Sequence, residues 1–421
     1  MLKVAPSTVS GTTAAPPSKS YTHRALVLGL LSERSEVVEP LLSEDPLATL
    51  ACVERLGAKV ERFEDRVRLE GGAVATPADV LDAKNSGTTL RILTAVSALA
   101  PGTSVLTGDA SLRRRPMQPL FDALRPLGVE AYSTRGNGCA PVVVRGTLEG
   151  GETTIAGDVS SQFVSAILLA ATRAEHATDL ILTTPLKSRP YVDITLDMIA
   201  RFGGAAAATP DGFSVPGGQA LAGAVYRVPG DWSSAAFPWC AAAVTGGEVT
   251  VTNLDMASSQ GDRAILGALE AFGCNVKAGD GIATVRGGDL RGIRWDLSDT
   301  PDMFPALAAV AAHARGETVL SGAAHLRYKE SDRIAAMVSE LRLMGVDADE
   351  RPDGAVIRGG RKLSGAKVTS LGDHRIEMAL VVAGLAAEGA TVVDDHESHA
   401  VSYPRFLEEF ARLGARLEVV S

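Results

Sequence analysis

The chain has 421 residues, of which 46% are hydrophobic and 22% are charged. This composition is typical of a globular protein and excludes a disordered one, and the length predicts two or three domains. The net charge of −9 argues against a nucleic-acid-binding protein, because such proteins neutralise phosphates with a broad basic surface. Any anion-binding site must therefore be local.

Four cysteines, Cys52, Cys139, Cys240 and Cys274, lie far apart in the sequence and form no CxxC pair. Their spacing indicates neither a zinc site nor a disulfide framework, so we expect buried thiols in a reducing compartment. The first residues, MLKVAPSTVSGTTAAPPSK, lack the apolar core of a signal peptide, and apolar runs such as MALVVAGLAA are about half the roughly 20 residues that span a bilayer. We therefore expect a soluble cytoplasmic protein.

In chain order, the first predicted elements are a short strand in LKVAP (residues 2–6) and a helix followed by a β-branched strand in SYTHRALVLGLLSERSEVVEP (residues 20–40). The same helix and strand return in GTTLRILTAVSALAPGTSVLTGD (residues 87–109) and, near the end, in DHRIEMALVVAGLAAEGATVVDD (residues 373–395). Each of these segments contains a helix with an apolar face and then a strand, and each is followed by a loop and a second helix. This recurrence predicts an internal repeat.

The second helix of each repeat ends in a large apolar residue and glycine, in the segments ERLGAKV, RPLGVEA, ARFGGAA, EAFGCNV, RLMGVDA and ARLGARL. A glycine at this point suits the left-handed cap of a helix, and the alternating segments that follow predict a hairpin. The six glycines are 69 to 75 residues apart: Gly57, Gly128, Gly203, Gly273, Gly345 and Gly414.

Each repeat is therefore one βαβαββ module. The sixth ends at ARLEVVS without its last strand, which the opening strand LKVAP could supply. The sequence thus predicts an α/β protein with three modules in each of two lobes. One lobe comprises residues 14–228, and the other comprises residues 1–13 and 229–421.

Unusual polar residues collect where the first helix of each module begins: SKSYTHR, KNSGTTLR, VSSQF, DWSSAAF, TPDMF and GDHR. A helix N-terminus offers unpaired N–H donors and roughly half a positive charge, so Ser, Asn, Gly and Lys there can hold an anion. A single Ser or Asn is most often only an N-cap. Six such starts, enriched in Lys, Arg and Gln, favour a shared anion site.

Further charged groups lie in SLRRRPMQPL, LRYKESDR and GDHR. Arg113 and Arg114 could equally be a solvated charge run, and KESDR could be a helix start with weak ion pairs. A lone histidine such as His374 is more often structural than catalytic, and no second ligand at metal spacing accompanies it. Two acids, Asp302 and Glu330, stand among these cations, and this combination suits two anionic substrates with proton transfers between them. No Walker, GxGxxG, GxSxG or HExxH motif occurs.

Eight segments, in this order along nearly the whole chain, together resemble the 5-enolpyruvylshikimate-3-phosphate (EPSP) synthase family: PPSKSYTHRALVLGLL, NSGTTLR, RRRPMQPLFDAL, SSQFVSAILL, SRPYVDITLDM, PDMFPALAAVAA, RYKESDR and GDHRIEMAL. The resemblance implies the two-lobed enolpyruvyl transferase fold, an inside-out α/β barrel. It also implies transfer of the enolpyruvyl group of phosphoenolpyruvate to the 5-hydroxyl of shikimate 3-phosphate in aromatic amino-acid synthesis. It implies no metal or organic cofactor. We expect a monomer that acts on small molecules and binds neither nucleic acid nor a membrane.

The resemblance also implies roles for individual residues. Asp302 is the expected acceptor of the hydroxyl proton and Glu330 the expected acid at the methylene carbon, and Lys19 and His374 could share these transfers. The residues expected to bind shikimate 3-phosphate are Lys19, Ser20, Arg24, Ser160, Ser161, Gln162, Ser188, Tyr191, Asp302, His325 and Lys329. The residues expected to bind phosphoenolpyruvate are Lys19, Asn85, Gly87, Arg115, Gln162, Glu330, Arg333, His374 and Arg375.

The chain departs from the enterobacterial and plant pattern of this family at three positions. His23 and His325 stand where those relatives have Asn, and Val401 stands where they carry a Lys before TFP. Because Val401 replaces that Lys, one expected contact to phosphoenolpyruvate is missing.

Two rival functions remain. UDP-N-acetylglucosamine enolpyruvyltransferases share the donor and the chemistry, but they carry a cysteine loop before their RP element, and DASLRRRP has no cysteine. A non-catalytic anion-binding module would explain the helix starts but gives Asp302 and Glu330 no role. An RNA-terminus enzyme is disfavoured by the acidic balance and by the 5% aromatic content.

Overall fold

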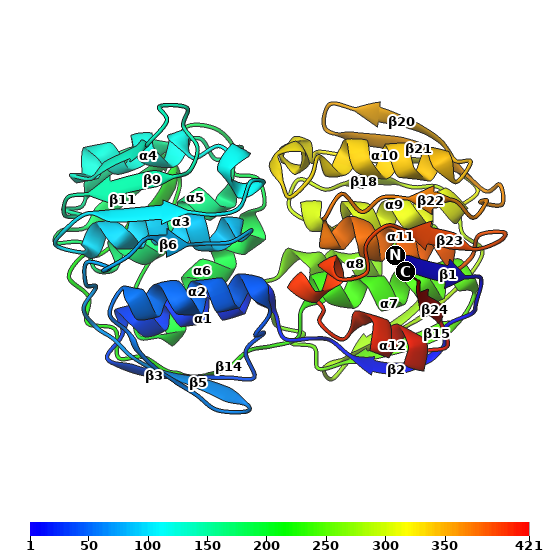
Figure 1. The fold of residues 1–421 in the computed structure, drawn as a ribbon, viewed down its shortest axis with the longest axis horizontal. Helices are drawn as coiled ribbons and strands as arrows, with labels where there is room; N and C mark the ends of the chain where they lie inside the picture. Colours follow the sequence, from blue (N-terminus) through cyan, green and yellow to red (C-terminus); the bar gives the residue numbers. More distant parts are fainter. Residues whose placement is uncertain (421) are drawn as a thin grey trace. The chain divides into compact units, whose positions relative to one another are not determined.

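The computed structural model describes residues 1–420 (Figure 1). The chain forms two compact units, one of Pro17–Val228 and one of Met1–Pro16 with Pro229–Ser421. We call them the inserted unit and the split unit. The sequence placed the first boundary after residue 13, whereas the division follows Pro16, because residues 11–14 form a strand that pairs within the split unit.

The strands of the inserted unit form three four-stranded sheets in the orders β14-β3-β5-β4, β6-β7-β9-β8 and β10-β11-β13-β12. In each sheet the first pair is parallel and the other two pairs are antiparallel. Their bounds are β3 (Arg34–Val38), β4 (Lys59–Arg62), β5 (Arg66–Glu70), β6 (Leu81–Asp82), β7 (Ser104–Thr107), β8 (Glu130–Ser133), β9 (Val142–Arg145), β10 (Gly151–Ile155), β11 (Thr178–Leu182), β12 (Ala207–Thr209), β13 (Gly212–Val215) and β14 (Val225–Arg227).

The described strands of the split unit form three similar sheets in the orders β2-β15-β17-β16, β18-β19-β21-β20 and β22-β23-β1-β24. Strand β1 pairs antiparallel with both β23 and β24, which confirms that the opening strand completes the sixth module. The bounds are β1 (Leu2–Ala5), β2 (Gly11–Ala14), β15 (Glu248–Thr252), β16 (Asn275–Gly279), β17 (Ile282–Arg286), β18 (Arg294–Asp296), β19 (Gly316–Ser321), β20 (Asp347–Arg351), β21 (Gly354–Gly359), β22 (Lys367–Val368), β23 (Thr391–Val393) and β24 (Arg416–Val419).

Besides the sheet that β1 completes, two more sheets take a strand from outside their own stretch of chain. β14, the last strand of the inserted unit, pairs with β3 and serves as the first strand of module 1. β2, which precedes the inserted unit, pairs with β15 and serves as the first strand of module 4. The repeat pattern along the chain predicted neither of these two strand placements.

The first helices of the six modules begin where the sequence predicted. They are α1 (Lys19–Leu31), α3 (Gly87–Val96), α5 (Ser161–Ala171), α7 (Trp232–Thr245), α9 (Phe304–His313) and α11 (His374–Gly384). We expected apolar faces, but these helices are buried on nearly all sides, and in α11 even Arg375 and Glu377 are buried. The reason is that they pack on one another inside each unit, α3 on α5 and α9 on both α7 and α11 (Figure 1).

The second helices lie nearer the surface and alternate buried with exposed residues, as in α6, where Val192, Thr195 and Ile199 are buried. With the inner helices covered by sheets, this arrangement is the predicted inside-out α/β architecture, and each unit has its own hydrophobic core. The bounds are α2 (Glu44–Arg55), α4 (Gln118–Leu124), α6 (Arg189–Arg201), α8 (Ile265–Phe272), α10 (Arg333–Leu343) and α12 (Phe406–Arg412). Short 3₁₀ helices are η1 (Ser97–Leu99), η2 (Leu112–Arg114), η3 (Arg125–Leu127), η4 (Gly261–Ala264), η5 (Pro301–Met303), η6 (Ala324–Tyr328) and η7 (Ser398–Val401).

All six repeat glycines adopt the left-handed conformation, with φ between +84° and +109°. Each is followed by the predicted antiparallel hairpin or, in module 6, by the pairing of β24 with β1. One expectation about the cysteines was wrong: Cys139 is only half-buried, because it lies in the loop between β8 and β9 rather than in a core element. All four thiols are free. Among the described residues, no helix has the length and apolarity to cross a membrane.

Two of these glycines provide a matched test of the helix ends. A methyl group on Gly345 (φ +87°) would meet nothing within 4 Å, whereas a methyl group on Gly273 (φ +107°) would lie 2.6 Å from the carbonyl oxygen of Asp289. We expect Gly345→Ala to cost about 1 kcal/mol for the left-handed backbone alone, and Gly273→Ala to cost a further ~1–3 kcal/mol for the clash. Chemical denaturation of both variants measures this difference, and equal losses would contradict the assigned geometry.

Candidate active site

In the inserted unit, three predicted residues lie close together: Gly87 at the start of α3, Gln162 at the start of α5, and Arg115 just after η2. The Gln162 side chain accepts a hydrogen bond from Arg91 Nη1 at 2.5 Å and donates one to Thr88 Oγ1 at 3.0 Å. A methyl group on Gly87 would lie 3.2 Å from Arg115 Nη1, 3.5 Å from Arg91 Nη1 and 3.6 Å from Gln162 Oε1. Guanidinium groups of two arginines therefore face the glycine at the start of α3.

Arg115 is buried, and Asn85 and Ser111 accept its hydrogen bonds. Its Nη2 donates to Asn85 Oδ1 at 2.7 Å and to Ser111 Oγ at 3.3 Å, and Asn85 Nδ2 donates to Asp109 at 2.7 Å. Because both acceptors are neutral, they hold the guanidinium in place without cancelling its charge. We call the residues around Gly87 the α3 cluster: Asn85, Gly87, Arg91, Arg115 and Gln162.

Arg24 lies at the meeting point of α1, α5 and α6. Its guanidinium donates to Thr195 Oγ1 at 2.8 Å, to the Tyr191 carbonyl at 2.8 Å, to the Ser20 carbonyl at 3.0 Å and to Ser165 Oγ at 3.3 Å. These bonds use four of its five N–H groups. Burial lowers the pKa of Arg24 to about 10, so it stays charged at neutral pH. Arg24, which the sequence predicts to bind shikimate 3-phosphate, therefore also holds the starts of α1 and α6 in place.

The other predicted residues of the inserted unit lie at the starts of three helices. Lys19, the first residue of α1, pairs with Asp45 at 2.9 Å. Ser160 caps α5 by accepting from the Gln162 N–H at 3.3 Å, and Ser161 follows it. Ser188 precedes α6 in a left-handed conformation with φ of 55°.

His23 is a buried neutral side chain. Burial, Lys19 and Arg24 hold its pKa well below the usual value, and its Nδ1 lies 2.7 Å from Thr49 Oγ1. Histidine in place of the Asn of enterobacterial and plant relatives therefore adds no positive charge here at neutral pH.

In the split unit, Arg333 is the centre of the charged groups. Its Nε donates to Asp373 at 2.8 Å, its Nη1 to Asp302 at 2.9 Å, and its Nη2 to Glu330 at 2.8 Å and to Asp373 at 3.2 Å. Arg333 is 1% exposed and Asp373 is fully buried. Burial alone would lower the pKa of Arg333, but the three carboxylates outweigh it and raise that pKa.

Asp302, in η5 just before α9, is surrounded by three cations. Its Oδ1 accepts from Arg333 and lies 3.7 Å from Lys329 Nζ, and its Oδ2 lies 3.2 Å from Arg375 Nη2. Burial would raise the pKa of Asp302, but Arg375, Lys329 and Arg333 outweigh it and hold the pKa well below its usual value. The carboxylate is therefore ionised at neutral pH.

Asp373 organises the start of α11, the last of the six inner helices. Its Oδ1 accepts from the Arg375 N–H at 3.0 Å, and its Oδ2 accepts from Ser331 Oγ at 3.0 Å. His374, the first residue of α11, is buried, with Nδ1 3.7 Å from Asp373 Oδ1. The split unit thus brings Asp302, Lys329, Glu330, Arg333 and Arg375 together, and His325 lies in η6 shortly before Lys329.

Sequence reasoning missed Arg91 and did not assign Asp373 a role. Both stand inside the quoted segments NSGTTLR and GDHR, so the signal was present. Arg91 was passed over because it lies one turn into a helix that reads as apolar, and Asp373 because it reads as an ordinary N-cap.

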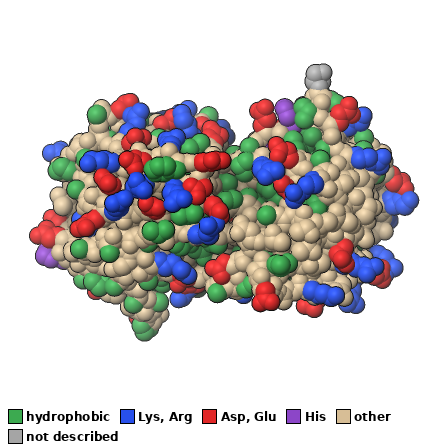
Figure 2. Space-filling model, turned by 90° about the horizontal axis from the view of Figure 1, so that it is seen from below, with side chains coloured by type: hydrophobic (Ala, Val, Ile, Leu, Met, Phe, Trp, Pro, Cys, Tyr) green, Lys and Arg blue, Asp and Glu red, His purple; other side chains and the backbone are tan. Residues whose placement is uncertain are grey.

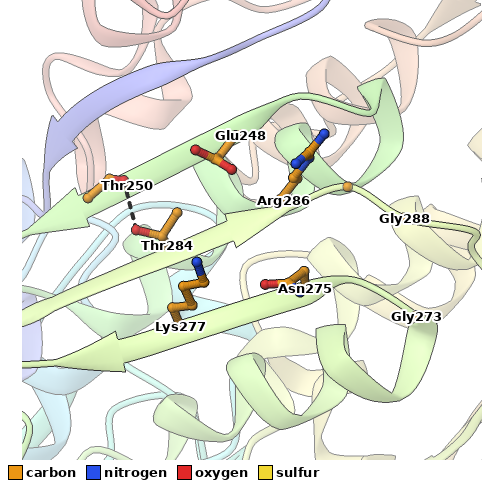
Figure 3. Close-up of a pocket in the computed structure, with 9 residues that line it drawn as sticks. Glu248, Thr250, Gly273, Asn275, Lys277, Thr284, Arg286 and Gly288 are labelled. Atoms are coloured by element: carbon orange, nitrogen blue, oxygen red, sulfur yellow. Dashed lines mark hydrogen bonds between the residues drawn. The ribbon is translucent and has the colours of Figure 1, made fainter.

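A separate polar hollow lies on the outer face of the β2-β15-β17-β16 sheet, lined mainly by β15, β16 and β17 (Figure 3). Its side chains include Glu248, Arg286 and Lys277, and Thr250 Oγ1 lies 2.8 Å from Thr284 Oγ1 across the strands. Glu248 is the register partner of Arg286, and Thr250 that of Thr284. These are ordinary cross-strand pairs on the outer face of a sheet, and the hollow contains none of the predicted site residues.

Six βαβαββ modules in two units, with charged groups at the starts of the inner helices, define the two-lobed enolpyruvyl transferase fold. The family model of EPSP synthase (3-phosphoshikimate 1-carboxyvinyltransferase) matches residues 4–410. The chain belongs to this family.

The relatives cover the whole chain. A protein of Methanocella arvoryzae named 3-phosphoshikimate 1-carboxyvinyltransferase is 48% identical over 421 residues, covering 99% of each chain. A protein of Halobacterium salinarum with the same name is 49% identical over 423 residues, covering 98% of each. The solved structure of EPSP synthase from Acinetobacter baumannii has a TM-score of 0.83 at 33% identity and covers 100% of this chain and 99% of that one.

Removing the Arg333 guanidinium tests its place at the centre of the split unit. We expect Arg333→Met to cost about 3–5 kcal/mol of unfolding free energy, because it leaves buried carboxylates without their partner. The control is Arg342→Met on the same helix, where the side chain is 54% exposed and pairs with Asp349 at 3.6 Å, and where we expect about 1 kcal/mol or less. Similar losses in chemical denaturation would contradict the assignment.

Proposed function

We propose that this chain transfers the enolpyruvyl group of phosphoenolpyruvate to the 5-hydroxyl of shikimate 3-phosphate and releases phosphate, as an EPSP synthase of the shikimate pathway. The observation that carries the proposal is the Asp302 carboxylate held among Arg333, Lys329 and Arg375, in a chain of this family. The names of the relatives support this acceptor over UDP-N-acetylglucosamine, and they support an enzyme over a non-catalytic module.

We infer that the α3 cluster holds phosphoenolpyruvate. Arg91 donates to Gln162 Oε1 and Arg115 to Asn85 Oδ1, and both guanidinium groups face the start of α3 beside Gly87, where a phosphate or a carboxylate would meet them. Gly87 leaves room for that anion at the start of α3, where the helix end adds its own N–H donors. Lys19, Glu330, Arg333, His374 and Arg375 complete the proposed set.

We assign shikimate 3-phosphate to the starts of α1, α5 and α6 and to groups of the split unit. Arg24 acts mainly by orienting the Ser20 and Tyr191 backbone, because four of its N–H groups are already used inside the unit. The full proposed set is Lys19, Ser20, Arg24, Ser160, Ser161, Gln162, Ser188, Tyr191, Asp302, His325 and Lys329.

The proposed reaction proceeds by addition and elimination. A proton adds to the methylene carbon of phosphoenolpyruvate, and Glu330 is the assigned acid. The acceptor oxygen then bonds to the adjacent carbon while its proton passes to Asp302, which gives a tetrahedral intermediate. The carbon–oxygen bond to phosphate then breaks, Asp302 passes its proton to the departing phosphate, and a methyl proton returns to Glu330, which forms the enol ether of the product. Lys19 and His374 share these proton transfers.

Anion binding assists this chemistry electrostatically. Arg375, Lys329 and Arg333 hold the pKa of Asp302 low, which makes it a weak base. A substrate phosphate or carboxylate that shares these cations reduces their effect on Asp302, so its pKa rises. Asp302 therefore becomes a better base when both substrates are bound.

We further propose that the enzyme acts as a cytoplasmic monomer on small molecules, without nucleic acid or membrane partners. The four free thiols support a reducing compartment. On the face drawn in Figure 2, Lys and Arg side chains are interspersed with Asp and Glu rather than gathered into one basic patch. Analytical ultracentrifugation tests the oligomeric state.

Phosphate release tests the proposed reaction. The purified chain is supplied with phosphoenolpyruvate and either shikimate 3-phosphate or UDP-N-acetylglucosamine, and we expect release only with the former. In the same assay we expect Asp302→Asn to lower kcat by about 10²–10⁴-fold and to leave calorimetric binding of shikimate 3-phosphate largely intact. Release with the nucleotide sugar, or with neither acceptor, would favour one of the two rival functions.

The α3 cluster gives a separate test of donor binding. We expect Gly87→Ala to raise the KM for phosphoenolpyruvate on the order of tenfold, because overpacking by one methyl group costs about 1–3 kcal/mol. The KM for shikimate 3-phosphate should change less than twofold. The control is Gly267→Ala in α8, where a methyl group meets only Trp295 at 3.7 Å. An unchanged KM for phosphoenolpyruvate in Gly87→Ala would show that phosphoenolpyruvate does not bind at the α3 cluster.

A further inference from the structure

A line of buried hydrogen bonds joins α1, α2 and α3 inside the inserted unit, and the reaction steps above do not use it. His23 Nδ1, in α1, lies 2.7 Å from Thr49 Oγ1, in α2. Thr49 Oγ1 lies 2.6 Å from Thr89 Oγ1, in α3, and Thr89 Oγ1 donates to Ser86 Oγ at 2.7 Å. All four side chains are at most 1% exposed. We call them the His23–Ser86 network.

The network ends at the start of α3, where the proposed site for phosphoenolpyruvate lies. Ser86 is the N-cap of α3, and its Oγ also accepts from the backbone N–H of Thr89 at 3.2 Å. It stands between Asn85, which accepts from Arg115, and Gly87, which both arginines of the α3 cluster face. A shift of Ser86 therefore moves both of its neighbours and the N–H groups at this helix end.

The hydroxyl protons give the network one direction. The single hydroxyl proton of Thr89 goes to Ser86 Oγ, or to the Asp45 carbonyl oxygen at 3.5 Å. In both cases Thr49 is the donor in the bond between the two threonines. Thr49 then has no proton left for His23, so Nδ1 of the imidazole carries the proton and donates to Thr49.

The other ring nitrogen of His23 agrees with this direction. Nε2 is buried without a partner in the described part of the chain, so a proton there would be left unpaired at a cost in free energy. Burial lowers the pKa of His23, so the ring is neutral and carries one proton. His23 is therefore the tautomer that is protonated at Nδ1.

We propose that His23, Thr49 and Thr89 are positioning residues for phosphoenolpyruvate, and that the Nδ1–H tautomer of His23 holds the N-cap of α3 through the two threonines. His23 lies one helical turn after Lys19, so the network ties the start of α1 to the start of α3. These residues act through Ser86 and exchange no proton with the substrates. This inference rests on the proposed function, because it assigns phosphoenolpyruvate to the α3 cluster.

The main test is Thr49→Val, which keeps the shape of the side chain and removes the hydroxyl group from the middle of the network. We expect the KM for phosphoenolpyruvate to rise about three- to tenfold, the effect of a lost hydrogen bond. The values of kcat and of the KM for shikimate 3-phosphate should stay within twofold, because a weaker hold on the anion affects the bound substrate and the transition state alike.

Two further variants separate positioning from packing. Thr49→Ser keeps the hydroxyl group and should restore the wild-type KM for phosphoenolpyruvate. The matched control is Thr94→Val in α3, because Thr94 is fully buried but donates within its own helix, to the Leu90 carbonyl at 2.7 Å. Thr94→Val should leave both KM values within twofold of the wild type.

The tautomer of His23 gives a second measurement, which needs no turnover. Long-range ¹H–¹⁵N spectra of enzyme labelled with ¹⁵N-histidine distinguish a protonated ring nitrogen from an unprotonated one, and His23→Gln identifies the His23 signals. We expect His23 to be protonated at Nδ1 in the wild type and in Thr94→Val, and to lose this preference in Thr49→Val. Protonation at Nε2 in the wild type would overturn the proposal.

Calorimetric titration with phosphoenolpyruvate separates this inference from the proposed function. Weaker binding by Thr49→Val than by Thr94→Val supports the inference even where the wild type releases no phosphate, and in that case only the proposed reaction would be wrong. Equal KM values and equal affinities of the two valine variants for phosphoenolpyruvate, with normal phosphate release by the wild type, would overturn this inference alone.

Discussion

The buried guanidinium of Arg333 holds together the charged centre of the split unit. Three carboxylates, from Asp302, Glu330 and Asp373, share its N–H groups at 2.8 to 3.2 Å. Each of these groups would be costly to bury alone, and the pairing with hydrogen bonds is what makes their burial possible. A lysine could not replace Arg333, because only the planar fork of arginine donates in several fixed directions at once. The starts of α9, α10 and α11 can therefore meet in the protein interior.

The two arginines of the α3 cluster have different hydrogen-bond acceptors. Arg91 donates to the side chain of Gln162 and Arg115 to that of Asn85, and both acceptors are neutral. The split unit places carboxylates beside the guanidinium group of Arg333. One fold repeated six times thus provides helix starts where arginine bonds to neutral side chains and helix starts where arginine bonds to carboxylates.

Local rules made much of this predictable from the sequence. Glycine is the residue that adopts a left-handed helix end without strain, so the repeat glycines revealed the modules and where their second helices end. The placement of β2 and β14 could not be read in this way, because pairing between strands far apart in the chain leaves no periodic signal. The site was predicted where residues stand at helix starts, as Lys19 and His374 do. Arg91 was missed because only the folded chain brings it to Gln162, 71 residues away in the sequence.

The strand exchange at β2 and β14 has a consequence for synthesis on the ribosome. The inserted unit receives its last strand, β14, before the main part of the split unit is made, so it can complete its fold while translation continues. β1 and β2 emerge first but wait for β23, β24 and β15, the first two of which lie near the end of the chain. Unpaired strands readily join other chains. These two strands therefore remain without their pairing partners until the segments that carry β15, β23 and β24 have been made.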